Sequence, residues 1–421
     1  MRAPQNIEDL GVPRKLLEDL ALKHFMLHGE LSLIQLADEM RVNLKIADDL
    51  FQRLRRDQVV QVTGMASGVH HVTTTSEGKA RALELLQLSQ YAGPAPISLD
   101  DYVTRVRAQT VRRMEVRPAE VERAFESLVL DPETLTQVGT AVVSGRAIFL
   151  YGPSGTGKTT VAETLWQLFH QDPVWVPHAL AIDGQIITIY DPHVHQAAEQ
   201  PVPHEVDRRW VLCRRPRVIA GGELTIEMLD LQYNPQAKFY AAPMQLKANN
   251  GLLIIDDFGR QRVRPEELLN RWVVPLDRGI DFLTLAGGKK IEVPFDNLVV
   301  FATNLDPSAL VDEAFLRRIQ SKIKLDNIQP EQFQEICHRV CSEFGLPYDH
   351  AAIDHLINII SGDLTQPLRG CYPRDIMNQV MWAARYEGRE PHLDNQAIEI
   401  ACRTYFLSPE AQARTSGGVV R

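Results

Sequence analysis

Residues 152–159 carry the clearest chemical signal in the chain, the sequence GPSGTGKT. It matches the phosphate-binding loop pattern, in which glycines let backbone N–H groups curl around phosphate and a helix N-terminus follows. Lys158 would neutralise the β- and γ-phosphates of a nucleotide, and the Thr159 hydroxyl would be offered to Mg²⁺. Residues 147–151 read as a buried strand and residues 160–170 as a helix with one apolar face, the context that such a loop requires. A glycine-rich strand-to-helix turn without a ligand is the alternative.

Two later apolar runs also end in polar side chains. Residues 252–255 are followed by Asp256 and Asp257, and residues 298–303 by Asn304. Because parallel strands deliver their carboxyl ends to one edge of a sheet, we expect these side chains to lie near the phosphate loop. Asp256 would hold Mg²⁺ through its water shell, and Asp257 would orient the attacking water. Asn304 would bind the γ-phosphate or that water, unless it is only a strand-ending turn residue.

Three arginines follow. Arg317 and Arg318 precede an alternating strand, and Arg374 stands at the start of a helix, after Tyr372 and Pro373. A guanidinium stabilises the charge on a phosphoryl group in transfer. For any one of these arginines, a solvated surface position is the alternative.

The order of these motifs resembles that of the AAA+ ATPases, and the resemblance covers roughly residues 120–405. It implies ATP and Mg²⁺ as ligands, a Walker A motif at residues 152–159, a Walker B motif at residues 252–257, a first sensor at Asn304, a trans-acting arginine finger at Arg318 with Arg317 as its rival, and a second sensor at Arg374. The nucleotide contacts expected from it are Gly152, Pro153, Ser154, Gly155, Thr156, Gly157, Lys158, Thr159, Thr160 and Arg374, with Thr159 and Asp256 at the metal. The family usually has glutamate at the position of Asp257. The shorter side chain moves the carboxylate back by about 1.5 Å, so we expect slower turnover.

A finer placement comes from residues 281–295, where apolar residues alternate on both sides of Ala-Gly-Gly and predict a β-hairpin. A hairpin just before the first sensor resembles the clade of MoxR-type ATPases, magnesium chelatase subunits and NtrC-type activators. The stretch 173–250 is longer than one helix and one strand require. It predicts an insert around residues 209–224, which would either line a central pore or form a structural hairpin on the outer surface.

The fold expected is therefore α/β, a doubly wound parallel sheet with additional domains. Residues 14–90 read as three helices, a β-ribbon and a closing helix, a pattern that resembles a winged-helix domain. The predicted divisions are a winged-helix-like domain at 1–90, a linker and helical connector at 91–119, an ATPase core at 120–327, a helical lid at 328–407 and a flexible tail at 408–421.

Composition narrows the class of protein. The 421 residues include 45 basic and 54 acidic side chains, a net charge of −9, which argues against a protein coated in nucleic acid. The five scattered cysteines favour a reducing compartment, and no apolar run approaches a membrane span, so we expect a soluble, cytoplasmic protein without membrane insertion. Two short motifs look like metal sites, Cys337-His-x-x-Cys341 and Asp191-Pro-His-x-His195. We interpret both as structural.

Two functions from different classes fit this reading. The first is a ring-forming ATPase, with six subunits suggested by the resemblance, that remodels a protein partner gripped by the N-terminal domain or the pore. The second is a DNA-binding ATPase or regulator that uses the winged helix. Residues 1–90 hold 11 basic and 12 acidic side chains, a net of −1, and Asp48 and Asp49 lie on the expected recognition helix, which favours the first function. A slowly hydrolysing nucleotide switch is a third possibility, which Asp257 would allow.

Overall fold

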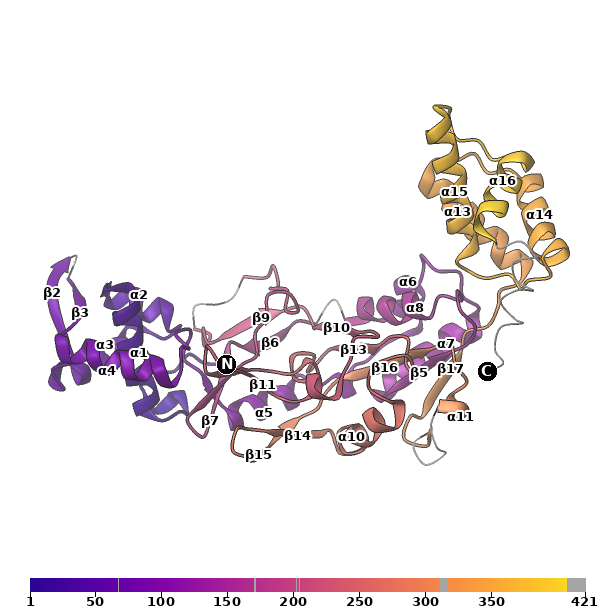
Figure 1. Ribbon diagram of the computed structural model, residues 1–421. Helices are drawn as coiled ribbons and strands as arrows, with labels where there is room; N and C mark the ends of the chain where they lie inside the picture. The colour runs from indigo at the N-terminus through magenta and orange to yellow at the C-terminus, as the bar shows by residue number, and fades with distance from the viewer. Residues whose placement is uncertain (67, 170–171, 202, 204, 311–315, 407–421) are drawn as a thin grey trace, which may run out of the picture.

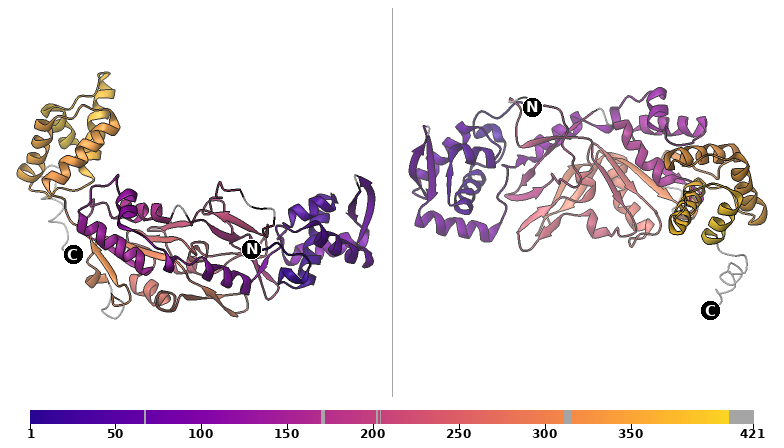
Figure 2. Two further views of the ribbon diagram at one scale, coloured as in Figure 1. Left: turned by 180° about the vertical axis from the view of Figure 1, so that it is seen from behind. Right: turned by 90° about the horizontal axis from the view of Figure 1, so that it is seen from above.

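The computed structural model describes residues 1–421 except 67, 170–171, 202, 204, 311–315 and 407–421. The predicted tail therefore lies outside the described residues. The N-terminal unit and the helical C-terminal unit lie at opposite ends of an elongated molecule, with the α/β core between them (Figure 1, Figure 2).

A five-stranded parallel sheet forms the centre of the core, in the order β10-β13-β16-β5-β17. Its strands are β5 (Ile148–Tyr151), β10 (Arg217–Ala220), β13 (Leu252–Ile255), β16 (Leu298–Thr303) and β17 (Ser321–Lys324). All residues of β13 and β16 are buried, because layers of protein cover both faces of the sheet. The prediction of an α/β fold around a parallel sheet is confirmed.

Successive strand residues enter two separate apolar cores. Phe149, Leu253 and Phe301 pack on one face of the sheet, whereas their neighbours Leu150 and Ile254 pack on the other. This alternation follows from the two-residue period of a strand. The helices of the core are α5 (Leu99–Ala108), α6 (Pro118–Ala124), α7 (Pro132–Ser144), α8 (Lys158–Thr164), α9 (Met244–Lys247), α10 (Pro265–Arg278) and α11 (Pro307–Leu310). The described residues also form short 3₁₀ turns, η1 (Glu8–Leu10), η2 (Val111–Arg113), η3 (Leu165–Phe169) and η4 (Ile226–Leu229).

A second, mixed sheet lies between the core and the N-terminal unit, in the order β11-β12-β8-β7-β4. Its strands are β4 (Ile97–Ser98), β7 (Ala179–Ile182), β8 (Gln185–Thr188), β11 (Gln232–Asn234) and β12 (Phe239–Ala241). Beside it, β6 (Val174–Pro177) pairs with β9 (Trp210–Cys213) in an antiparallel ribbon. Residues 173–250 thus supply most of an extra β layer.

The prediction that residues 209–224 form a hairpin is wrong. Its first apolar run is β9, which pairs with β6, and its second is β10, which is the edge strand of the central sheet. The basic residues between them do not face a pore as a group, since Arg215 is buried and its guanidinium donates to the carbonyls of Gln109 and Asn250. Each of the two strands is positioned by a partner from a distant segment, β9 by β6 and β10 by β13.

The hairpin predicted before the first sensor is confirmed. Strands β14 (Ile280–Thr284) and β15 (Lys290–Pro294) pair antiparallel around a Gly-Gly turn. Residues of both strands, Leu283 and Val293, pack in the apolar core of the extra β layer. The clade that this hairpin suggests stays a prediction.

The N-terminal unit has the element order that the sequence predicts. It contains α1 (Arg14–His28), β1 (Glu30–Ser32), α2 (Leu33–Glu39), α3 (Leu44–Arg56), β2 (Val60–Ala66), β3 (Val69–Thr74) and α4 (Ser76–Leu88), with the strands in the order β1-β3-β2. Side-chain oxygens of Ser32, Asn43 and Thr75 cap α2, α3 and α4, and these caps explain where the helices begin. The winged-helix assignment stays a prediction.

The C-terminal unit is helical, as predicted. It consists of α13 (Pro330–Phe344), α14 (His350–Asn358), a π turn η5 (Ile359–Asp363), α15 (Tyr372–Glu387) and α16 (Asn395–Tyr405). Phe333, Leu356 and Ile376 form part of its own core. Nowhere in the described parts of the chain is a helix both long and apolar enough to span a bilayer.

Candidate functional site

The phosphate loop joins the carboxyl end of β5 to the first turn of α8. Three of its glycines, Gly152, Gly155 and Gly157, have positive φ angles of 142°, 81° and 89°. A Cβ atom on Gly152 would lie 2.1 Å from the carbonyl oxygen of Leu325, so no other residue fits there without moving β17. The loop is therefore shaped by glycine at the positions that the motif prescribes.

Lys158 lies inside the curl of this loop. Its residue is 6% exposed, and its ammonium donates hydrogen bonds to the carbonyl oxygens of Gly152 (3.0 Å) and Pro153 (2.6 Å). Burial lowers the pKa of the ammonium, and the carboxylates of Asp257 and Asp256 oppose that shift. The Lys158 ammonium has three N–H donors and bonds two carbonyl oxygens, so a phosphate could accept from it and supply a negative charge.

Thr159 and Asp256 meet across the sheet edge. The Thr159 hydroxyl lies 3.0 and 3.1 Å from the two carboxylate oxygens of Asp256. Hydroxyl and carboxylate oxygens are hard ligands that suit Mg²⁺, which usually keeps several waters and phosphate oxygens as its other ligands. In the described ranges, no group of three or more His, Cys, Asp and Glu side chains is placed to hold a metal ion, so phosphate and water would complete the coordination.

Asp257 has an unusual backbone for a residue other than glycine, with φ at +48°. Aspartate and asparagine tolerate this left-handed region better than glutamate does. The backbone thus gives a physical reason for aspartate where the resembled family has glutamate. The amide of Asn304 donates to the Asp257 carboxylate across 3.4 Å, so the two polar strand ends do meet as predicted.

The turn after β13 is held by Gln261, a residue that is not predicted from the sequence. The Gln261 side chain donates to the Asp256 carbonyl oxygen at 2.6 Å and accepts from the Gly259 amide at 2.8 Å. The Phe258 amide donates to Ala302 of β16 at 2.7 Å. These contacts fix the turn that presents Asp257.

The loop, the two acids and the helical unit enclose a cleft of about 640 Å³. The predicted residues that line it are Ser154, Gly155, Thr156, Gly157, Lys158, Thr159, Thr160, Asp256, Asp257, Asn304 and Arg374. Hydrogen bonds from the helical unit reach the core beside the cleft, among them one from Arg339 to the Leu128 carbonyl at 3.4 Å. Arg339 of α13 donates to the Glu126 carbonyl at 2.6 Å, and the Cys371 amide donates to the Gly155 carbonyl at 3.1 Å.

Part of the cleft wall is apolar and was missed from the sequence. It is lined by Leu128, Leu130, Ile328, Ile336 and Val340. These residues come from three separate segments, each of which reads locally as ordinary helix or loop, so no sequence signal joins them. An apolar wall beside a phosphate loop suits a flat aromatic base.

Arg374 reaches the cleft but is engaged by a carboxylate of its own unit. Its guanidinium makes two hydrogen bonds to Glu343 of α13, at 2.9 and 2.6 Å, and lies over the Phe344 ring. The pair raises the pKa of Arg374 and lowers that of Glu343. Contact with a phosphate would require Arg374 to exchange one anion for another.

The structure does not bring Arg318 to this cleft. Its Nε atom lies 2.9 Å from the Asp277 carboxylate at the end of α10, outside the residues that line the cleft. An intramolecular role at the phosphate is therefore not supported for Arg318. Its position agrees with the expectation that it lies away from its own P-loop.

The two motifs with a metal-like appearance have other partners. Nδ1 of His195 accepts from the Asp191 amide, so Nε2 carries the proton and donates to the Lys247 carbonyl, each at 2.9 Å. Cys337 and Cys341 are buried in the apolar core of the C-terminal unit, where burial raises the pKa of both thiols. Both motifs thus have structural surroundings.

Residues 329–404, which span most of the C-terminal unit, match a family described as a domain of unknown function (DUF8689). No protein of curated function matches the chain significantly. Among solved structures, the chain is similar to the Thermotoga maritima RuvB Holliday junction branch migration motor, with 14% identity, a TM-score of 0.38, and coverage of 65% of this chain and 69% of that one. Domain III of the Thermotoga maritima replication initiation protein DnaA has 14% identity and a TM-score of 0.39 over 70% of this chain and 100% of that one. Likenesses at this level say nothing about what the chain binds or does.

The geometry described above is what places the chain in a fold class. A parallel five-stranded sheet has the P-loop at the end of an interior strand, two polar strand ends beside it, and a helical unit over the cleft. The chain therefore has an α/β fold with a phosphate loop at the carboxyl edge of a parallel sheet, as the sequence predicts.

Proposed function

We propose that this chain is an ATPase, hydrolysing ATP to ADP and phosphate, and that it uses this reaction to remodel a protein partner. The observation that supports the ATPase most directly is the meeting of Lys158, Thr159, Asp256 and Asp257 in one cleft with an apolar wall. A cation, a metal-binding hydroxyl–carboxylate pair, a second acid and a base-sized apolar surface are the parts that phosphoryl transfer to water requires.

In the proposed reaction, the oxygen of a water attacks the γ-phosphorus while the bond to the β,γ-bridging oxygen breaks, and ADP leaves with the bonding electrons. Asp257 orients the water by accepting a hydrogen bond from it, one proton of the water ends on the released phosphate, and Asn304 fixes the Asp257 carboxylate. Lys158 and the backbone amides of the loop balance the charge on the phosphates. Thr159 and Asp256 would hold Mg²⁺, which supplies further charge neutralisation when it is bound.

Assembly is part of the proposal. Arg318 would reach the γ-phosphate only from a neighbouring subunit, and such head-to-tail contacts close into rings. We propose a homo-hexamer, the count that the resemblance suggests. Arg374, after release from Glu343, would contact the γ-phosphate within the subunit.

A protein partner is proposed in preference to DNA because of charge. The N-terminal unit has a net charge of −1 from 11 basic and 12 acidic residues, whereas duplex binding draws on a basic face. The DNA-binding alternative stays open to test, as does a slow nucleotide switch.

The test is hydrolysis and nucleotide retention by the full chain and by Asp257→Asn. We expect the wild-type chain to release phosphate from ATP in a Mg²⁺-dependent manner, and Asp257→Asn to bind ATP with similar affinity yet retain it uncleaved. Hydrolysis by Asp257→Asn at the wild-type rate would show that Asp257 does not orient the water. Absence of ATP binding by the wild-type chain would end the proposal.

A further inference from the structure

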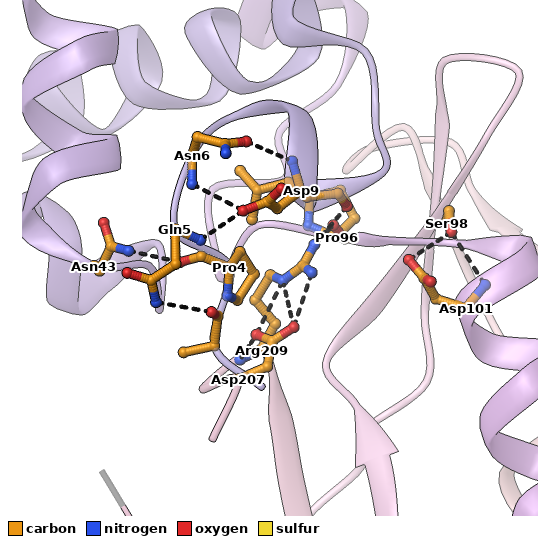
Figure 3. Close-up of polar contacts among 12 residues, drawn as sticks. Pro4, Gln5, Asn6, Asp9, Asn43, Pro96, Ser98, Asp101, Asp207 and Arg209 are labelled. Atoms are coloured by element: carbon orange, nitrogen blue, oxygen red, sulfur yellow. Dashed lines mark hydrogen bonds and ion pairs between the residues drawn. The ribbon is translucent and has the colours of Figure 1, made fainter. Parts of the chain in front are cut away.

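The N-terminal unit meets the rest of the chain at a buried ion pair. Arg209 and Asp207 are only 3% and 5% exposed, and the guanidinium donates to both carboxylate oxygens at 2.8–3.2 Å. The remaining nitrogen, Nη1, donates to the carbonyl oxygens of Leu10 (2.9 Å) and Pro96 (3.0 Å), as Figure 3 shows for Pro96. Leu10 leads into the N-terminal unit and Pro96 leads out of it. One guanidinium therefore fastens both chain crossings to the segment that precedes β9.

Further backbone contacts join the N-terminal residues to residues 173–250. The Gln90 amide donates to the Ala237 carbonyl at 2.8 Å, and the Ala3 amide donates to the Glu205 carbonyl at 2.7 Å. Ala179 and Ile186 of the extra β layer belong to the same apolar core as the helices of the N-terminal unit. Charge pairing, backbone hydrogen bonds and apolar packing all join the unit to the extra β layer.

The turn between α2 and α3 lies inside this joint. The Asn43 side chain, which caps α3, donates to the Pro4 carbonyl at 2.6 Å (Figure 3). Asp38 of α2 pairs with Arg208 at 2.8 Å. Arg41 and Val42 form one wall of a cleft of about 750 Å³, with residues of β9 opposite. The turn that precedes α3 thus contacts its own chain, whereas Leu44 and Lys45 in the first turn of the helix are exposed.

In a helix-turn-helix protein, the second helix of the motif, here α3, places its N-terminal end against base edges in the major groove. Even a single DNA-binding module buries roughly 600–1,000 Å² against the duplex, which requires an open face. Residues of the extra β layer lie beside the turn before α3 and leave the outer side of α3 exposed, so charge is the argument against a duplex there. The same helix carries Asp48 and Asp49, which would repel phosphate.

We infer that the N-terminal unit is a rigid arm of the motor, fastened through Arg209 and the turn before α3, and that this arm does not read duplex DNA with the acidic α3. The inference rests on the proposed function only in naming the motor. Arg209 and Asp207 are the residues that keep the joint closed.

The joint is tested by amide hydrogen exchange in the full chain. The Gln90 and Ala3 amides report on the joint, and the Ile254 amide in β13 reports on the core. The variant is the double substitution Asp207→Asn with Arg209→Met, because removing only the arginine would leave a buried unpaired carboxylate. Its matched control is Arg208→Met, the adjacent arginine, whose pair with Asp38 is exposed.

We expect slow exchange at Gln90 in the wild-type chain, exchange at least about tenfold faster in the double variant with Ile254 unchanged, and no change in the control. Slow exchange at Gln90 in the double variant would mean that the ion pair does not close the joint. Fast exchange at Gln90 in the wild-type chain would overturn the rigid arm itself.

DNA binding is measured in parallel by fluorescence anisotropy with a random 30-base-pair duplex. We expect the wild-type chain to show only weak binding that is lost at physiological salt and is unaffected by Lys45→Glu in α3. Binding that survives physiological salt and is lost in Lys45→Glu would show that α3 reads DNA, and would overturn the inference. If the wild-type chain does not hydrolyse ATP while its Gln90 amide exchanges slowly, the proposed function is refuted and the rigid arm is still supported.

Discussion

Replacing Lys158 by methionine is expected to change stability and nucleotide binding in opposite directions. Methionine keeps most of the length of the lysine stem and removes the buried charge. In the free protein this charge is held by only two carbonyl oxygens, and its burial lowers the pKa of the ammonium. Because the pKa in the folded state is lower than in the unfolded state, the unfolded state binds more protons between the two values. The charged lysine therefore costs stability at neutral pH, and this cost fades as the pH rises toward the ordinary lysine pKa.

The magnitude for ATP binding follows from the contacts that are lost. A charge-assisted hydrogen bond contributes about 1.5–3 kcal/mol, and Lys158 would make one to each of two phosphates. We therefore expect Lys158→Met to weaken ATP binding by about 3–6 kcal/mol, which is roughly two to four orders of magnitude in Kd. The melting temperature without nucleotide should stay level or rise, and the stability gained over wild type should shrink as the pH rises toward the ordinary lysine pKa.

Calorimetric titration with ATP and thermal unfolding at several pH values measure both effects. Lys79→Met, on the exposed face of α4, is the matched control and should change neither quantity. A Lys158→Met chain that binds ATP within threefold of wild type would refute the assignment of the phosphate site. A chain that unfolds at a much lower temperature would show that Lys158 is a structural residue.

Three further predictions concern Asp257 and Glu343 of the cleft, and Arg318, which lies outside it. Asp257→Glu should destabilise the chain by about 1 kcal/mol, because glutamate tolerates the left-handed backbone less well, whereas its ATP hydrolysis should stay level or rise; denaturation and phosphate release measure the two effects. Glu343→Gln should free Arg374 and tighten binding of ATP a few-fold with ADP binding unchanged, and loss of that difference in a double variant with Arg374→Ala is the check. Arg318→Ala should bind ATP normally and hydrolyse it at least about 10³-fold more slowly. Mixing it with Lys158→Ala subunits should restore part of the activity, and no recovery in proven mixed assemblies would exclude a finger acting in trans.

The chemistry of the site was predictable because each part is local in sequence. The phosphate loop, the acids after β13 and Asn304 after β16 are short motifs, and the carboxyl edge of a parallel sheet necessarily brings them together. The left-handed backbone of Asp257 was not predictable, because an aspartate at a strand end is compatible with many turns. Without knowledge of the φ angle of Asp257, the shorter side chain of aspartate relative to glutamate predicts only slower turnover.

What the sequence could not predict depends on contacts between distant segments. The run around Trp210 and the run beginning at Arg217 are both short and apolar, so they look like the two halves of one hairpin. Their actual partners are β6 and β13, whose paired residues lie 33–39 and 35 positions away in the sequence. Glu343, likewise, is an ordinary exposed acid of α13 until Arg374 is brought next to it.

The arm and the site share one short route through the extra β layer. Arg209 precedes β9 directly, and Arg215 follows it with hydrogen bonds to the carbonyl oxygens of Gln109 (2.9 Å) and Asn250 (2.7 Å). The next strand, β10, accepts the amide of Asp256 at the Ala220 carbonyl, 2.9 Å away. Because the buried guanidiniums hold both ends of β9, a shift of the Asp256 turn on nucleotide exchange would move the arm as a body and would not be absorbed by a flexible linker. Such coupling requires that the joint stay closed in every nucleotide state, so the Gln90 amide should exchange equally slowly with ATP, with ADP and without nucleotide; opening of the joint in any one of these states would mean that the arm is released and not driven.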